Sequence, residues 1–294
     1  ENLHFFLPKT YIFKLPLTAD KAPKKYRASI SAFYGVGMNI GTPVGTMIAS
    51  RYLTNVSGGI YVFMVIEVVF TLLGLFLVGD GSNKGEKVKK LHGAELLEAF
   101  IFPIHGDIRD FYLAVFGKLL FTSAEFVITG YQLYIFVDYM KLSSAQATSN
   151  LSTMSVILLI TGVAFAIIGG PIADKFHSLK LLVVASTIVM GIGVAIPAID
   201  PKPWTMFVYA ALCGCAMGMY MSVDQALNVS VLPNPDSAAK DLGIVNLANS
   251  LGQVFGPIMA SIIISSIGYR MMFPAAGIMC LVGAILILMI RKVH

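Results

Sequence analysis

GMNIGTPVGTMIA at residues 37–49 and ANSLGQVFGPIMA at residues 248–260 are two versions of one pattern. In each stretch a small residue recurs at every fourth position, which forms one smooth ridge on a helix. The ridges consist of Gly37, Gly41, Gly45 and Ala49, and of Ala248, Gly252, Gly256 and Ala260. Each lies in an apolar stretch of roughly twenty residues, long enough to span a bilayer. Because duplicated halves are common in secondary transporters, the repeat predicts a membrane protein built from two related halves.

The composition also indicates an integral membrane protein. Hydrophobic residues make up 56% of the chain and charged residues 13%, whereas a soluble domain carries about 25% charged residues. A chain that is this apolar cannot cover its surface with polar groups, so we expect the lipid bilayer to surround it. The net charge of +5 does not indicate nucleic acid, because the basic residues lie in the loops between apolar spans. Cys213, Cys215 and Cys280 lie in apolar runs and are expected to be buried thiols.

Eight apolar stretches are candidate transmembrane helices, so we expect an all-α bundle. They cover residues 28–50, 58–78, 111–138, 146–172, 180–199, 204–231, 242–266 and 271–290. A polar segment at about 79–110 separates the second stretch from the third. It carries Lys84, Lys87, Lys89 and Lys90, and this charge run predicts a linker between two units.

Lysine and arginine predict the orientation of these spans. One set of loops holds only Arg51, Lys141, Lys202 and Arg270. The opposite set is much richer and holds Lys21, Lys24, Lys25, Arg27, Lys84, Lys87, Lys89, Lys90, Arg109, Lys175, Lys180, Lys240, Arg291 and Lys292. Since basic loops stay on the cytoplasmic side, we expect a multi-pass protein of the plasma membrane with a cytoplasmic C-terminus.

The loop after the fourth span reads Gly170-Pro-Ile-Ala-Asp174-Lys175-Phe-His-Ser-Leu-Lys180. It resembles the signature Gly-x-x-x-Asp-Arg/Lys-x-Gly-Arg/Lys-Arg/Lys of the major facilitator superfamily of transporters. The first half of the signature matches, whereas His177 and Ser178 depart from the second half. The run Gly243, Gly252 and Gly256-Pro257 has the spacing of a second signature, which drug exporters of the superfamily carry on helix 5. Here that run lies in the seventh span, so the exporter signature is not met at its usual place.

The resemblance implies two six-helix halves joined by a basic cytoplasmic loop, with the eight spans as helices 5 to 12. Residues 1–78 would be the remnant of the N-terminal half, residues 79–110 the cytoplasmic linker, and residues 111–294 the complete C-terminal half. Helices 1 to 4 would be missing. On this basis we expect a fragment or the product of a truncated gene.

The third span, helix 7 by resemblance, carries a polar stripe on one face. Its members are Lys118, Thr122, Glu125, Thr129 and Gln132, with Tyr131 and Tyr134 at the polar end. Ionisable groups at membrane depth are costly and usually functional. The resemblance implies that this helix lines the central cavity, so we expect the part from Glu125 to Tyr134 to bind the solute, with Glu125 as a candidate proton carrier. A structural pair of Glu125 with a neighbouring helix is the alternative, and Lys118 is close enough to the helix end to snorkel.

Amide side chains mark a second candidate surface. The seventh span, helix 11 by resemblance, carries Asn246, Asn249 and Gln253 on a face distinct from its small-residue ridge. We expect the ridge to pack against a neighbour while the amides face the cavity, where they could bind sugar hydroxyls. Hydrogen bonding between helices is the alternative. Asn39 in the first span is a further candidate lining residue.

Two groups of residues are candidates for gating. Asp224, in the sixth span, lies toward the cytoplasmic end and fits either an inner gate or a solvated helix end. The resemblance also implies that the loop with Gly170, Asp174 and Lys175 contacts the other half of the transporter. Its partner would be the start of helix 5 near Arg27, where Asp174 favours the positive N-terminal end of the helix.

These patterns predict a secondary active transporter of a small organic solute that works by alternating access. Coupling to H+ through Glu125 is one option, and the amides and tyrosines favour a sugar or a glycoside. The alternatives are a multidrug exporter of the same superfamily, which the methionines and aromatic residues favour, and an inactive truncated transporter.

Other classes of protein fit the sequence less well. It contains no nucleotide-binding loop, and it has no cluster of His, Asp and Glu at membrane depth that would suit an enzyme. His92, His105 and His177 lie in loops and lack the spacing of metal ligands. We therefore expect no enzymatic activity, no metal and no cofactor.

Overall fold

The computed structural model of the chain describes residues 37, 40–41, 43–53, 55–77, 102–103, 108–176, 178–233 and 238–292. A short helix covers residues 43–51, and α3 (Val56–Leu77) follows it. The remaining long helices are α5 (Arg109–Thr129), α7 (Ser144–Phe176), α8 (Leu179–Ala195), α9 (Pro203–Ser230), α10 (Ala238–Ile267) and α11 (Tyr269–Leu288). Within these ranges, seven helices are long and apolar enough to cross a membrane. The prediction of an all-α, multi-pass membrane protein is confirmed.

The predicted spans agree with these helices to within a few residues, apart from three places. The predicted helix at 28–50 falls largely outside the described residues. The predicted loop from Gly170 is wrong, because α7 continues through Pro171 to Phe176 and holds Gly170, Asp174 and Lys175 in its last two turns. A proline is tolerated there because neighbouring groups in a membrane bundle can satisfy the backbone carbonyl that it leaves without a donor.

The third difference is a break in the predicted helix 111–138. After α5 ends at Thr129, a turn leads into the short α6 (Gln132–Tyr134) and the π-helical η3 (Ile135–Tyr139). The break lies beside a proline of α10, since a Cβ atom on Gly130 would be 3.1 Å from Cγ of Pro257. Because glycine at position 130 has no Cβ atom, the break after α5 and Pro257 of α10 can lie close together. Short π-helical turns of this kind are frequent at functional sites.

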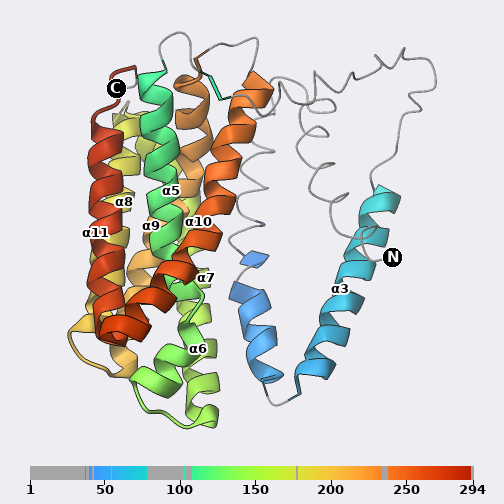
Figure 1. Ribbon diagram of the computed structural model, residues 1–294. Helices are drawn as coiled ribbons and strands as arrows, with labels where there is room; N and C mark the ends of the chain where they lie inside the picture. The colour runs from blue at the N-terminus through green and yellow to red at the C-terminus, as the bar shows by residue number, and fades with distance from the viewer. Residues whose placement is uncertain are drawn as a thin grey trace.

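Six helices form a curved row that reads α10, α5, α11, α8, α9, α7 in order of contact. Figure 1 shows α10, α5 and α11 in front and α3 standing apart from the bundle. The helix at 43–51 lies at the open side of the curved row, where its two end helices α7 and α10 border the same cavity. Oγ of Ser50 is 2.8 Å from Oγ of Ser152 on α7. We call the end of the bundle that carries residue 292 the C-terminal face, and the other end the opposite face.

Glycines set the distance between most neighbouring helices of the row. The ridge of α10 packs on α5: a Cβ atom at Gly252 would be 2.7 Å from Cβ of Thr122, and one at Gly256 would be 2.7 Å from Cβ of Phe126. Gly117 and Gly283 bring α5 and α11 together in the same way. Lipid tails are as apolar as leucine, so tight van der Waals contact of this kind drives helix association in membranes.

The tightest interface joins α7 and α9, and it uses a third ridge of small residues, which was not predicted from the sequence. Ala210, Gly214, Gly218 and Ser222 recur at every fourth position of α9. A Cβ atom at Gly218 would collide with the carbonyl oxygen of Gly162 and lie 2.7 Å from the nitrogen of Ala166. The two backbones are therefore in direct contact along this seam.

A buried carboxylate holds the chain in place after α11. Asp110, at the start of α5, accepts hydrogen bonds from the backbone N–H groups of Arg291 (2.8 Å) and Lys292 (2.7 Å). Nζ of Lys180 donates to the carbonyl oxygen of Ile290 at 3.0 Å. These three bonds, which we call the C-terminal clasp, tie α5, α8 and α11 together at the C-terminal face.

The α7–α9 seam gives a direct test of the fold. We expect Gly218→Leu to lower the free energy of unfolding by about 3 kcal/mol or more, because overfilling a packed site alone costs about 1–3 kcal/mol and here the obstacle is backbone. Thermal unfolding of the detergent-purified protein measures the effect. Gly243→Leu is the matched control, since no atom lies within 4 Å of a Cβ atom at Gly243. An equal loss of stability in the two variants would contradict the proposed packing.

Candidate functional site

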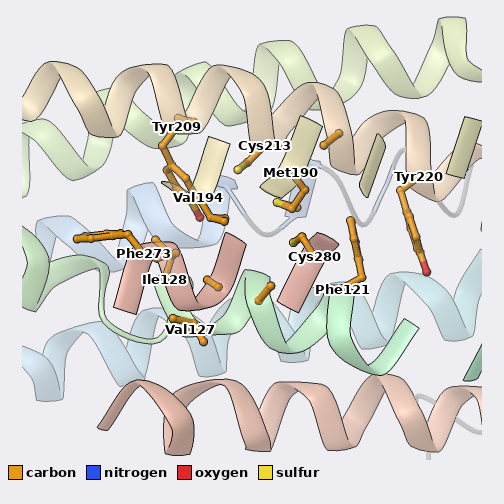
Figure 2. Close-up of a cluster of buried hydrophobic side chains, with 14 of the residues drawn as sticks. Phe121, Val127, Ile128, Met190, Val194, Tyr209, Cys213, Tyr220, Phe273 and Cys280 are labelled. Atoms are coloured by element: carbon orange, nitrogen blue, oxygen red, sulfur yellow. The ribbon is translucent and has the colours of Figure 1, made fainter. Parts of the chain in front are cut away.

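A cavity of about 260 Å³ lies inside the row of helices. Five helices of the row line it, and the helix at 43–51 closes the side between α7 and α10. The lining residues are Pro43, Thr46, Glu125, Phe126, Thr129, Gln132, Ser155, Leu158, Gly162, Met190, Tyr209, Cys213, Gly214, Met217, Met221, Asn249 and Gln253. Part of this wall belongs to the core cluster of Figure 2, which shows Tyr209, Cys213 and Met190. The wall is mostly apolar, with a few polar groups among the apolar ones, as is usual for small-molecule sites.

Glu125 is the one charged side chain among the described residues that line the cavity. It is partly buried, and no ion pair joins it to another described residue. Tyr209 on α9 lines the same cavity as Glu125 and Thr129 of α5. A carboxyl group in such a place can hold a proton or face a positively charged solute.

The two amides expected on α10 reach the cavity together with this carboxyl group. Asn249 and Gln253 line it, and Oγ1 of Thr122 donates to Oδ1 of Asn249 at 3.1 Å. That hydrogen bond leaves the NH2 group of Asn249 available as a donor. Asn246 lies one turn nearer the C-terminal face, is exposed, and does not line the cavity.

The break after α5 separates the predicted tyrosines from this cavity. Their ring centroids are 5.9 Å apart and their planes are tilted by 51°, but neither Tyr131 nor Tyr134 lines the cavity. Tyr134 is 54% exposed and borders a second, shallower groove of about 480 Å³ between α5, α6 and the helix at 43–51. Gly41 and Gly45 of the first ridge border the same groove.

The candidate gating residues lie in different places. Gly170 and Lys175 lie near the end of α7, where Lys175 is exposed. Arg27, Asn39 and the side chain of Asp174 lie outside the described residues, so the expected contact between Asp174 and helix 5 stays a prediction. Asp224 is only 4% exposed, which shows that it is not a solvated helix end.

Asp224 forms an ion pair that joins two helices. Nζ of Lys118 on α5 lies 2.5 Å from Oδ2 of Asp224 on α9. Lys118 is only 8% exposed, so it does not snorkel to the surface. Nδ2 of Asn228, one turn further along α9, donates to the same oxygen at 2.9 Å. Neither Lys118 nor Asp224 lines the cavity.

The α9 wall of the cavity was not predicted from the sequence. Tyr209, Cys213, Met217 and Met221 recur at every fourth position and each immediately precedes a member of the small-residue ridge on α9. The ridge turns toward α7, and this neighbouring row therefore turns toward the cavity. The regular spacing of four is the signal that could have identified these residues.

Comparison with known proteins agrees with this architecture. A family model described as the Major Facilitator Superfamily matches residues 113–294. The fujikurins efflux protein of Gibberella fujikuroi is 27% identical over 281 residues, which are 92% of this chain and 56% of that protein. The MFS transporter asaE of Aspergillus flavus is 24% identical over 291 residues, covering 96% of this chain and 62% of that protein.

A third relative is matched over a shorter stretch. The major facilitator superfamily multidrug transporter mfsC of Aspergillus fumigatus is 24% identical over 127 residues, covering 43% of this chain and 24% of that protein. The chain thus spans only part of the first two relatives: its match covers 56% of the length of the fujikurins efflux protein and 62% of the length of asaE. The match to the family model extends over more than half of the chain, and it agrees with the seven apolar helices: this protein belongs to the Major Facilitator Superfamily.

Proposed function

We propose that this protein is a secondary active carrier that exports a small amphipathic organic solute by alternating access. The cavity around Glu125 is the solute site, and the C-terminal face is the cytoplasmic side of the plasma membrane. The observation that carries the proposal is the cavity wall, in which one carboxyl group stands among amides, hydroxyl groups and flexible apolar side chains. The basic residues of the C-terminal face support the orientation.

The apolar part of the wall favours an amphipathic solute over a sugar. Met190, Met217 and Met221 contribute flexible, polarizable side chains, and Phe126 adds an aromatic ring. Methionine-rich walls adapt to ligands of different shape. Two of the relatives have names that state efflux or multidrug transport, which points the same way. A sugar or glycoside is the second candidate, because Asn249 and Gln253 offer amides that suit hydroxyl groups.

We assign proton coupling to Glu125. A carboxylate at membrane depth without a cationic partner is costly, whereas its protonated form is neutral and far less so. Solute and proton can therefore alternate at one site, so that binding of one accompanies release of the other. Tyr209 and Thr129 line the same cavity and contribute hydroxyl groups that can exchange a proton with bound solvent.

Transport assays separate the two solute classes. We expect inverted vesicles that carry the full-length protein to take up a fluorescent amphipathic dye, and we expect no uptake of radiolabelled glucose or a β-glucoside above that of empty vesicles. Sugar uptake without dye uptake would favour the second candidate. Transport of neither class would favour the inactive transporter that the sequence analysis kept as an alternative.

Glu125→Gln tests the coupling. We expect the variant to lose dye transport driven by a pH gradient, because the amide cannot release a proton, and to retain exchange of labelled for unlabelled dye. Glu125→Asp is the matched control, since it keeps a carboxyl group and should keep gradient-driven transport. Full gradient-driven transport by Glu125→Gln would rule out this residue as the proton carrier.

Alanine substitutions on α10 test the assignment of the cavity. A lost hydrogen bond costs about 1 kcal/mol, which corresponds to roughly a fivefold weaker apparent affinity. We expect Gln253→Ala to raise the KM of transport by this factor. Asn246→Ala should leave KM unchanged, because its side chain is exposed away from the cavity. Equal effects of the two substitutions would mean that the solute contacts a different face of α10.

A further inference from the structure

Four basic residues gather around the C-terminal clasp, where the ends of three helices meet. Asp110 binds the N–H groups of Arg291 and Lys292, and Arg109 directly precedes it on α5. The ammonium group of Lys180 on α8 is itself part of the clasp. Figure 1 shows this end of the chain at the top of α11, which packs between α5 and α8. We call these four residues the basic cluster.

The basic cluster presents a net positive charge to the surroundings. Arg109 and Arg291 are exposed, and Lys180 is partly exposed. None of these three side chains forms an ion pair with an acidic residue in the part of the chain that the structure describes. The carboxylate of Asp110 is only 2% exposed and is bound by backbone N–H groups. An anionic partner from outside would neutralise the exposed charges.

Basic residues at the opposite face are placed differently, because they already have partners within the protein. Nζ of Lys202 lies 2.8 Å from Oδ2 of Asp200. Nε of Arg270 donates to the carbonyl oxygen of Ala198 at 2.9 Å. The contrast singles out the basic cluster as the place where positive charge remains available for a ligand.

Next to the basic cluster, α8 and α11 expose apolar faces. Their large exposed side chains recur at helical spacing and include Leu181, Ile188 and Ile192 on α8 and Leu281, Ile285 and Leu288 on α11. The two helices are in contact, since a Cβ atom on Gly277 would be 3.2 Å from the carbonyl oxygen of Gly191. Leu181 directly follows Lys180, and Leu288 lies three residues before Arg291. Both apolar faces therefore begin at the basic cluster.

This combination of charge and apolar surface fits the chemistry of a phospholipid. A guanidinium group can bind a phosphate through two parallel N–H···O bonds. An ammonium group has three hydrogens, and Lys180 uses one of them for the carbonyl oxygen of Ile290. The acyl chains of the same lipid molecule can lie along the exposed faces of α8 and α11. A soluble phosphate would make only the first set of contacts.

We propose that this corner of the bundle is a binding site for an anionic phospholipid. Arg291, Lys180 and Arg109 hold the headgroup, and the acyl chains follow the apolar faces of α8 and α11 away from the C-terminal face. The inference goes beyond the proposed function and does not rest on the solute or on its coupling. It agrees with the proposed orientation, because anionic lipids are concentrated in the cytoplasmic leaflet.

The test measures which lipid lies beside α11. In the full-length protein with its native tryptophans replaced by phenylalanine, Ile285→Trp places one fluorophore on the lipid-facing side, about 9 Å along the helix from Arg291. The protein is reconstituted into vesicles of phosphatidylcholine with a minor share of phosphatidylserine. Bromine atoms are carried by the acyl chains of the phosphatidylserine in one set of vesicles and by an equal amount of phosphatidylcholine in the other. Bromine quenches tryptophan at short range, so the two quenching efficiencies give the relative affinity for the two lipids.

We expect phosphatidylserine to be preferred at this position about fivefold or more, since each basic residue near a membrane surface contributes about that factor for an anionic lipid. Lys180→Gln/Arg291→Gln should bring the relative affinity close to one. Lys141→Gln/Lys202→Gln is the matched control, because both side chains are exposed at the opposite face, and it should leave the preference unchanged. If the first variant does not accumulate, Arg291→Glu is expected to abolish the preference while it keeps the N–H group that Asp110 binds.

Equal quenching by the two lipids in the parent protein would overturn the proposal. So would a preference that survives both Lys180→Gln/Arg291→Gln and Arg291→Glu. A preference lost on addition of inorganic phosphate, but kept in sodium chloride of the same ionic strength, would assign the site to a soluble phosphate compound instead of a lipid. Because the measurement uses no solute, its outcome is independent of the transport assays.

Discussion

Close approach of helix backbones is the constraint on which the rest of this structure depends. A bilayer offers little hydrophobic gain when one apolar helix covers another, so the helices associate where small side chains let their backbones touch. Glycines at Gly117, Gly218 and Gly256 fix three such seams. Two of these seams lie at one end of the curved row and one at the other, the centre of the row is left to longer side chains, and the cavity lies there.

Two kinds of interface therefore coexist in one bundle. The glycine seams are dense and have a single good arrangement, so the helices that they join should move as units. The interface between α5 and α9 instead consists of an ion pair and a ring stack between long side chains.

The sequence predicts those features that depend only on residues close to one another along the chain. Spans follow from apolar length, and the division of α10 between a packing ridge and the cavity amides Asn249 and Gln253 follows from spacing. Contacts between distant segments could not be predicted in this way. Lys118 and Asp224 are 106 residues apart, and each has an ordinary interpretation by itself. The break at Gly130 likewise depends on Pro257 of another helix, which no local pattern around Gly130 reveals.

The C-terminal clasp has a consequence for how freely its own sequence can change. Asp110 is bound by the N–H groups of residues 291 and 292, which almost every amino acid supplies. The side chains at these two positions are exposed, and neither takes part in these two bonds. Proline is the exception, since it has no N–H group to donate. The path of the chain after α11 thus depends on one acidic side chain at position 110, and the two bonds to it ask of residues 291 and 292 only that neither is proline.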